Sequence, residues 1–206
     1  MLDRSCRDRL ILGVSGFQKL ATDAGLVSFP DYGTLLGAVR HRDIIPWDKD
    51  ADVSIIVDLV DPAGRERWDG FQKTLHQEGF KKLGDHDPDN RLVLVHKRQA
   101  FDVFVWHRYA PGVFRRRKYC SPDRKLKQGL DLRDEWLTHM VPARLGSKIV
   151  SVPAGWWDRL THVYGDWQTP KDTKRLALTS RAFRLSKDLP VVIPDRDDPL
   201  DTQVRR

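Results

Sequence analysis

Cysteine and long apolar runs are scarce in this sequence of 206 residues. Its two cysteines, Cys6 and Cys120, give neither a disulfide framework nor the CxxC spacing of a metal site, so we expect two reduced thiols. No stretch approaches the roughly 18 consecutive apolar residues of a membrane span. The start of the chain also lacks the basic and apolar regions of a secretory signal. These absences predict a cytoplasmic protein with no integral membrane segment.

The composition is that of a globular protein. Hydrophobic residues make up 40% of the chain and charged residues 32%, which excludes wholesale disorder and collagen-like repeats. A chain of this size normally folds as one domain that buries about 70% of its unfolded surface. Prolines and aspartates crowd its end, so we expect one domain over residues 1–187 and a mobile tail over residues 188–206.

Positive charge is concentrated in the second part of the chain. The 36 Lys and Arg residues against 29 Asp and Glu residues give a net charge of +7. Up to Ala110 there are 16 basic and 17 acidic residues, and the rest carries 20 and 12, or a net +8. Such a region attracts phosphates, nucleic acid or anionic lipid, so all three classes of partner stay open at this point.

Helix and strand patterns alternate along the chain, which predicts an α/β domain. Apolar residues at helical spacing predict helices at residues 5–24, 35–40, 65–79, 130–140 and 154–164. Aromatic and β-branched runs predict strands at residues 26–32, 51–59, 91–95, 100–106 and 148–152, with the third and fourth forming a hairpin.

Three aspartates lead into an apolar strand and carry the strongest chemical signal. Because side chains alternate along a strand, Asp48, Asp50 and Asp52 should face one way and the intervening apolar residues the other. Crowded carboxylates repel one another, and a Mg²⁺ ion between them would relieve that repulsion. The alternative is a turn of solvated acids ahead of a core strand.

Asp102 lies inside the most apolar and aromatic strand of the chain, residues 101–106. A charged carboxylate in such surroundings is costly unless it is paired, hydrogen-bonded or bound to metal. It could instead face solvent, or pair with Arg98 or Arg91. Two acids on one strand and a third on its neighbour can hold metal for phosphoryl or nucleotidyl transfer.

A glycine-rich turn before a short helix is the third feature. The backbone at Gly33 and Thr34 can approach an anion closely, and a helix N-terminus adds a favourable dipole. Arg40 and Arg42 could neutralise phosphate charge there. Equally, the turn could merely connect two elements and the arginines could be solvated.

The stretch GTLLGAVRHRDIIPWDKDADV at residues 33–53 closely resembles the signature of the LicD family, whose relatives include fukutin and fukutin-related protein. Asp102 resembles the third acid of that family, and YGDW at residues 164–167, followed by Pro170, is similar to its closing motif. The resemblance extends over roughly residues 10–170. It departs from the family at Lys49, where an acid often stands, and in the basic region that follows Pro111.

This resemblance implies a nucleotidyltransferase-like fold, a mixed sheet flanked by helices. It also implies transfer of a phospho-alcohol, such as phosphocholine or ribitol phosphate, from a CDP-linked donor to a sugar hydroxyl with Mg²⁺ or Mn²⁺. On this basis Asp50 and Asp52 are metal ligands, and Asp102 is the third ligand or a base. Asp48 is a flanking acid that could also take the proton of the acceptor hydroxyl. Gly33 and Thr34 would cradle the donor diphosphate, with Arg40 or Arg42 offsetting its charge.

Two rival functions remain. An enzyme of the same fold could transfer a nucleotide to nucleic acid or to a small molecule. A catalytically idle module could instead bind nucleic acid through its basic half, although that half lacks interleaved aromatic platforms. The acids at three matching positions favour an enzyme over the idle module. Tyr164 and Trp167 either line the site or pack around a helix end at Gly165.

Overall fold

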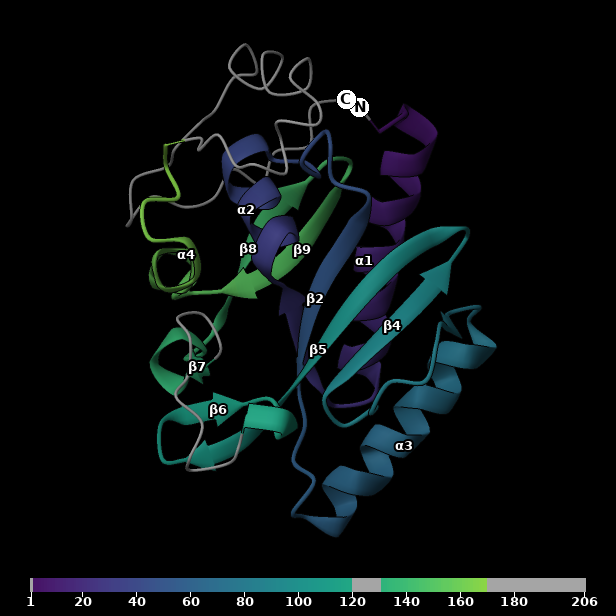
Figure 1. Ribbon diagram of the computed structural model, residues 1–206, viewed down its shortest axis with the longest axis vertical. Coiled ribbons are helices and arrows are strands. Elements are labelled where there is room, and N and C mark those ends of the chain that lie inside the picture. The colour runs from purple at the N-terminus through teal and green to yellow at the C-terminus, as the bar shows by residue number, and fades with distance from the viewer. Residues whose placement is uncertain (1, 120–130, 170–206) are drawn as a thin grey trace.

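A computed structural model describes residues 2–119 and 131–169 and shows a mixed sheet flanked by helices (Figure 1). The helices are α1 (Arg4–Asp23), α2 (Tyr32–His41), α3 (Pro62–Gln77) and α4 (Trp156–Tyr164), with short 3₁₀ turns η1 (Arg117–Tyr119) and η2 (Asp134–Trp136). The strands are β1 (Val27–Pro30), β2 (Asp50–Ile56), β3 (Lys81–Lys82), β4 (Arg91–His96), β5 (Gln99–Ala110), β6 (Val113–Arg115), β7 (Asp131–Arg133), β8 (Met140–Leu145) and β9 (Lys148–Pro153). The predicted α/β class is confirmed.

The main sheet has the strand order β1-β2-β5-β4-β3, and β6 and β7 extend it from β5. Strands β2 and β5 run parallel, while β1, β4 and β6 pair antiparallel with their neighbours. A parallel pair needs a crossover connection, and α3 lies within the long connection between β2 and β5. The N-termini of the two central strands, β2 and β5, therefore lie at the same end of the sheet.

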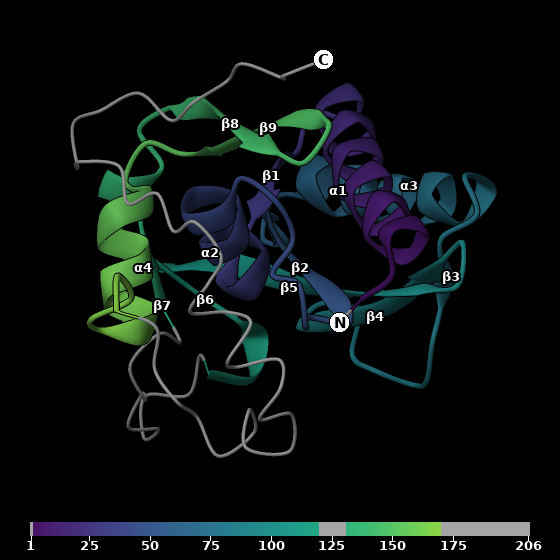
Figure 2. The same cartoon turned by 90° about the horizontal axis from the view of Figure 1, so that it is seen from above.

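One face of this sheet packs against α1 and α3 and forms the main core. Ala51, Val53 and Phe101 point into it and are fully buried. A Cβ atom on Gly13 of α1 would collide with the ring of Phe101, so glycine is required where this helix approaches the sheet. Figure 2 shows α1 and α3 side by side on this side of β1 and β2.

The opposite face carries α2 and, beyond it, α4. Figure 2 shows both helices across the sheet from α1, with the β8–β9 hairpin packed over α1 and β1. A second, smaller core lies here and is made of Phe29, Trp106, Phe114, Leu132 and Trp136. This face holds the polar residues that the sequence singled out.

The helix predicted at residues 130–140 is wrong. Leu132 lies in β7, which pairs with β6, and Trp136 lies in the turn η2. Leu132, Trp136 and Met140 are spaced by four residues, and this spacing resembles a helix. Both Leu132 and Trp136 are instead buried by contacts with the smaller core, which the local pattern could not reveal. The predicted tail at residues 188–206 lies outside the described residues.

Candidate active site

The aspartates of β2 stand on the sheet face opposite α1, as the alternation predicts. Ala51, Val53 and Ile55 are fully buried against the α1 side, whereas Asp50 and Asp52 are partly exposed on the other side. Asp48 lies just before the strand. The segment is therefore not merely a solvated turn, because strand geometry fixes two of its acids on one face.

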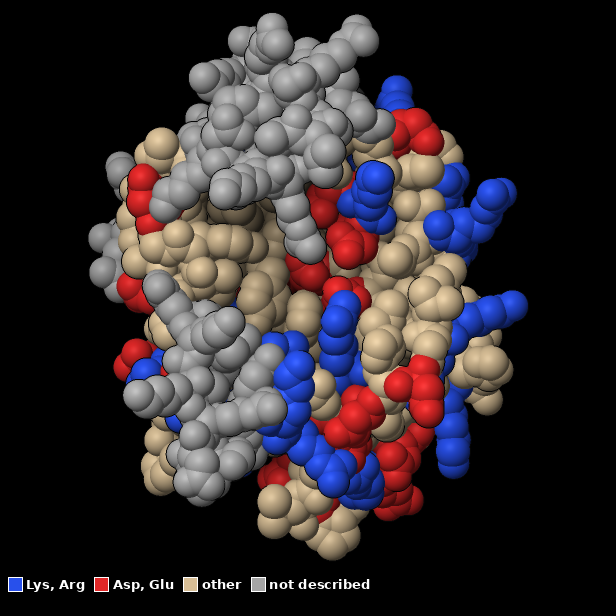
Figure 3. Space-filling view, viewed as in Figure 1, with Lys and Arg blue, Asp and Glu red and all other residues tan. Residues whose placement is uncertain are grey.

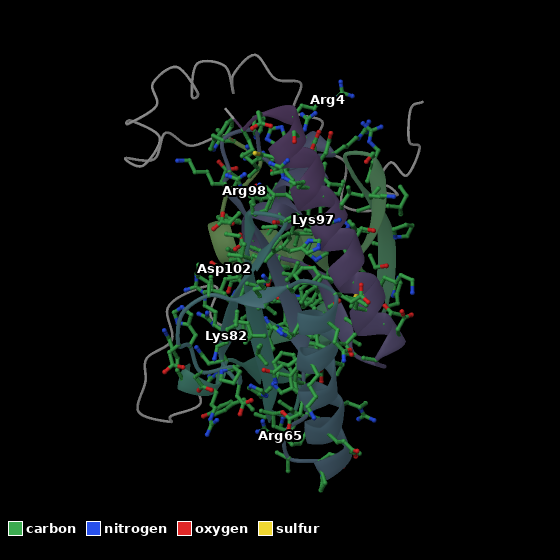
Figure 4. All side chains as sticks on the ribbon, turned by 90° about the vertical axis from the view of Figure 1, so that its right-hand side faces the viewer. Arg4, Arg65, Lys82, Lys97, Arg98 and Asp102 are labelled. Carbon is green, nitrogen blue, oxygen red and sulfur yellow. The ribbon has the colours of Figure 1, made fainter. Side chains whose placement is uncertain are left out.

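Asp102 lies directly beside Asp52. The two residues are register partners in the parallel β2–β5 pair, so their side chains leave the same face of neighbouring strands. Figure 4 shows Asp102 on the side of the sheet away from α1. The sheet thus brings together acids that are fifty residues apart in the sequence.

The start of α2 forms hydrogen bonds with both the side chain and the backbone of Asp52. The backbone N–H of Gly33 donates to Asp52 Oδ2 at 3.1 Å, and Thr34 Oγ1 accepts from the backbone N–H of Asp52 at 2.8 Å. A Cβ on Gly33 would lie 2.7 Å from Asp48 Oδ2 and 3.2 Å from Asp52 Oδ2. The absence of a side chain at Gly33 therefore leaves room beside two carboxylates.

A buried ion pair fixes this end of α2. Arg159 of α4 donates to both carboxylate oxygens of Asp31, at 2.9 and 2.8 Å, and both side chains are fully buried. Asp31 also caps α2 and accepts from Ser54 Oγ at 2.6 Å, while Trp106 Nε1 donates to Ser54 Oγ. Tyr32 then takes a φ of 44°, which is rare for a non-glycine residue, immediately before Gly33.

Burial and mutual repulsion both act on these acids. Burial, followed by the charge of Asp50 and a hydrogen bond with it, raises the pKa of Asp48 to about 7. Burial also raises the pKa of Asp52 well above its usual value, and the charges of Asp50, Asp48 and Asp102 add to this rise. The N–H of Gly33 acts in the opposite direction.

Arg91 of β4 is a positive group that contacts one of these acids. Its Nη2 pairs with Asp102 Oδ2, so the pairing with Arg91 that the sequence left open is confirmed. Arg91 stands opposite Phe104 in the β4–β5 ladder, and its guanidinium lies 5.8 Å from that ring. Figure 3 shows basic side chains gathered next to the central group of acidic ones on this face.

The two arginines predicted to bind donor phosphate lie at the C-terminal end of α2, and Gly33 lies at its start. Arg40 is buried, and its Nη1 donates to the carbonyl oxygen of Trp167 at 3.2 Å. Arg42 is the C-cap of α2, about 13 Å along the helix axis from Gly33. Trp167 is buried among other tryptophans, which matches the packing alternative.

Tyr164 approaches the acids from α4. Burial raises the pKa of its hydroxyl, and the next largest cause is the charge of Asp52. Sequence reasoning kept Tyr164 as an alternative but gave no role to Asp31 or Arg159. Arg159 lies between Trp156 and Leu160 on an amphipathic helix, which is a weak signal that it is buried and paired with an acid. Nothing in the sequence indicates that this acid is Asp31.

The acids fit a hard divalent cation in their chemistry. Oxygen ligands suit Mg²⁺ and Mn²⁺, the acids raise one another's pKa, and Gly33 leaves room beside Asp48 and Asp52. Within residues 2–119 and 131–169, no group of three His, Cys, Asp or Glu side chains is already arranged as a metal site. The Asp102 carboxylate is paired instead with Arg91 of β4.

Residues 25–155 match the LicD/FKTN/FKRP family at its nucleotidyltransferase domain. The chain belongs to this family. Among curated relatives, an uncharacterized protein of Rickettsia typhi is 34% identical over 90 residues, 44% of this chain and 26% of that protein. The ribitol 5-phosphate transferase FKRP of Mus musculus is 28% identical over 116 residues, 56% of this chain and 20% of that protein. The chain thus spans about a quarter or less of the length of these relatives.

A solved structure, a lincosamide antibiotic adenylyltransferase with lincomycin bound, superposes with a TM-score of 0.48 at 11% identity, over 82% of this chain and 92% of that one.

The LicD match itself covers the aspartates of β2 and β5 and the Gly33–Thr34 turn. It ends before α4, although Arg159 on that helix fixes the start of α2. No helix among the described residues is long and apolar enough to cross a membrane.

Proposed function

We propose that this LicD domain transfers a phospho-alcohol from a CDP-linked donor to a sugar hydroxyl of a glycan or glycoconjugate, with Mg²⁺ or Mn²⁺. The observation that carries the proposal is the register of Asp52 and Asp102 on neighbouring parallel strands, next to the Gly33–Thr34 start of α2. FKRP, which shares the family, is named a ribitol 5-phosphate transferase. Ribitol or glycerol phosphate and phosphocholine are therefore the candidate groups.

In this proposal Asp50, Asp52 and Asp102 hold the cation, which neutralises charge at the transferring phosphorus when bound. The hydrogen bonds of Gly33 and Thr34 keep Asp52 in place. The positive end of α2 also faces the region where a phosphate would lie. Because Gly33 lacks a side chain, phosphate oxygens can come close to this backbone.

The acceptor hydroxyl must lose its proton as it attacks the phosphorus. Asp48 suits this role best, since it lies against Gly33 and is linked to Asp50 by a hydrogen bond. Asp102 is the other candidate, but its carboxylate is already engaged by Arg91. A carboxylate within hydrogen-bond reach of the hydroxyl is the natural general base.

The test compares products from two kinds of donor. CDP-choline, CDP-ribitol and CDP-glycerol are each incubated with the protein, Mn²⁺ and a sugar acceptor, and so is a nucleoside triphosphate. The proposal predicts CMP from a CDP-alcohol and loss of that product in Asp52→Asn. Pyrophosphate from the triphosphate, with no CMP from any CDP-alcohol, would establish the nucleotidyltransferase alternative. Nucleic-acid binding with neither product would establish the idle module.

A further inference from the structure

The donor diphosphate needs a positively charged partner, and the arginines first considered for that role stand at the C-terminal end of α2. Arg40 is buried and bonded to the carbonyl oxygen of Trp167. Arg42 caps the far end of α2. The acids themselves repel a phosphate, so the partner should stand beside them on the same face of the sheet.

Arg91 has this position. Its Nη2 reaches Asp102 from the neighbouring strand, and its side chain is still 39% exposed. Within the described part of the chain, its buried Nε has no hydrogen-bond partner. A phosphate would therefore meet the exposed end of the guanidinium beside the acid pair, and a guanidinium is suited to bidentate binding of phosphate.

Aromatic rings and a second arginine continue from Arg91 to the start of α2. The guanidinium of Arg116 lies 5.1 Å from the Phe104 ring, on which Arg91 also lies. The Phe104 and Tyr32 ring centroids are 4.6 Å apart, and the charge of Arg116 acts on the Tyr32 hydroxyl. Because Tyr32 precedes Gly33, this row of side chains borders the region in which the proposed function places the diphosphate.

A divalent cation that binds the Asp102 carboxylate weakens the attraction of that carboxylate for Arg91. Asp102 is bound to Arg91 here, yet the proposed function requires it as a cation ligand. When Asp102 turns to the cation, the guanidinium loses its anion and needs another. A diphosphate brought to the same place supplies that anion.

We propose that Arg91 holds Asp102 while the site is empty and binds the donor diphosphate once Asp102 engages the cation. The inference rests on the proposed function for the identity of the donor. The ligand class that Arg91 would bind is a nucleoside diphosphate held with a divalent cation. Binding of such a ligand can be measured without turnover. Arg91 is thus a specificity-determining residue for the phosphates.

The first test titrates Mn²⁺ alone into the natural protein and into Arg91→Gln. Removing a positive charge that competes for Asp102 should tighten Mn²⁺ binding by about three- to tenfold. Arg91→Lys keeps the charge and should stay close to the natural affinity. Arg108→Gln is the matched control, because Arg108 forms a similar ion pair with Asp134 toward the other end of β5. Weaker Mn²⁺ binding in Arg91→Gln would overturn the proposal, since a purely structural arginine predicts that result.

The second test titrates CDP in the presence of saturating Mn²⁺. Arg91→Gln should weaken CDP binding about tenfold or more, Arg91→Lys should weaken it less, and Arg108→Gln should leave it unchanged. Cytidine should bind the natural protein and Arg91→Gln alike, since it carries no phosphate. Unchanged CDP affinity in Arg91→Gln, or no CDP binding by the natural protein, would overturn the inference. Absence of CMP release from CDP-alcohols, with these binding results intact, would refute only the proposed function.

Discussion

At the scale of single residues, Asp50, Asp52 and Asp102 differ from ordinary surface acids in being held against one another by strands. We predict that changing each to asparagine lowers transfer about a thousandfold, since a cation at the transferring phosphorus is worth several kcal/mol. Asparagine keeps the side-chain volume, and its Oδ1 can still accept from Gly33. Turnover assays check the loss, and full activity in any one variant removes that residue from the site.

The Asp52→Asn variant should also gain stability without metal. Burial, followed by the charges of Asp50, Asp48 and Asp102, raises the pKa of Asp52, so Asp52→Asn removes an unfavourable charge. A gain of 1 kcal/mol would raise Tm by about 2–4 °C in a chain of this length. A lower Tm in Asp52→Asn would instead show that the carboxylate stabilises the fold.

Gly33 offers a sharper test of geometry. In Gly33→Ala the new methyl group would lie 2.7 Å from Asp48 Oδ2, closer than packed atoms allow. We expect the carboxylates to move and transfer to fall at least about tenfold, with little loss of stability. Gly16→Ala on α1 is the control, because a Cβ there meets nothing within 4 Å. Equal activity in the two variants would show that the space beside Gly33 is not used.

At the scale of elements, the pair between Arg159 of α4 and Asp31 fixes the start of α2. Arg159→Met would leave Asp31 buried without its counter-charge, a loss of about 3–5 kcal/mol in the free energy of unfolding. Combining it with Asp31→Asn removes both charges and should recover part of that loss. Arg108→Gln breaks an exposed pair and should cost less than about 1 kcal/mol. Denaturant unfolding measures all three, and a loss in Arg159→Met no larger than in Arg108→Gln would contradict this role.

The elements that sequence reasoning predicted well are those with a local cause. Amphipathic spacing predicted α1 and α3, and alternation predicted which face of β2 holds the acids. The resemblance at residues 33–53 was confirmed by the family match. These patterns depend on neighbours within one helix turn or one strand, so the sequence alone reveals them.

What escaped prediction depends on partners distant in the chain. Strand β7 exists because Leu132 pairs with Phe114, and β8 exists because β9 returns beside it. Arg159 and Asp31 are 128 residues apart, and either could have had other partners. Arg42 stands at the opposite end of α2 from Gly33, and a motif does not show the direction of that helix.

At the scale of the whole molecule, net charge and site charge have opposite signs. The chain carries a net +7, while the centre of the face in Figure 3 is acidic. A positive surface attracts an anionic donor from a distance, and acids at the centre attract a cation. In the proposed function this arrangement suits a donor that arrives with a divalent metal, and we expect stability to depend on both pH and cation.

The last prediction concerns that dependence. Asp48 has a pKa of about 7 in the folded chain against 3.8 as its ordinary value, so the folded state binds the extra proton between these pH values. The raised pKa of Asp48 adds to the free energy of unfolding, and this contribution is fully present below about pH 4. It is lost as pH rises through 7, and the loss is at most about 4 kcal/mol. The gap in unfolding free energy between Asp48→Asn and the natural protein should therefore widen from pH 5 to pH 8.

Mn²⁺ competes with protons for these carboxylates, so the rise in Tm that it causes should be larger at pH 8 than at pH 5. Melting curves of both proteins, with and without Mn²⁺ at each pH, measure the effect. A Mn²⁺ shift in Tm that is independent of pH and equal in Asp52→Asn would show that the cation binds away from these acids.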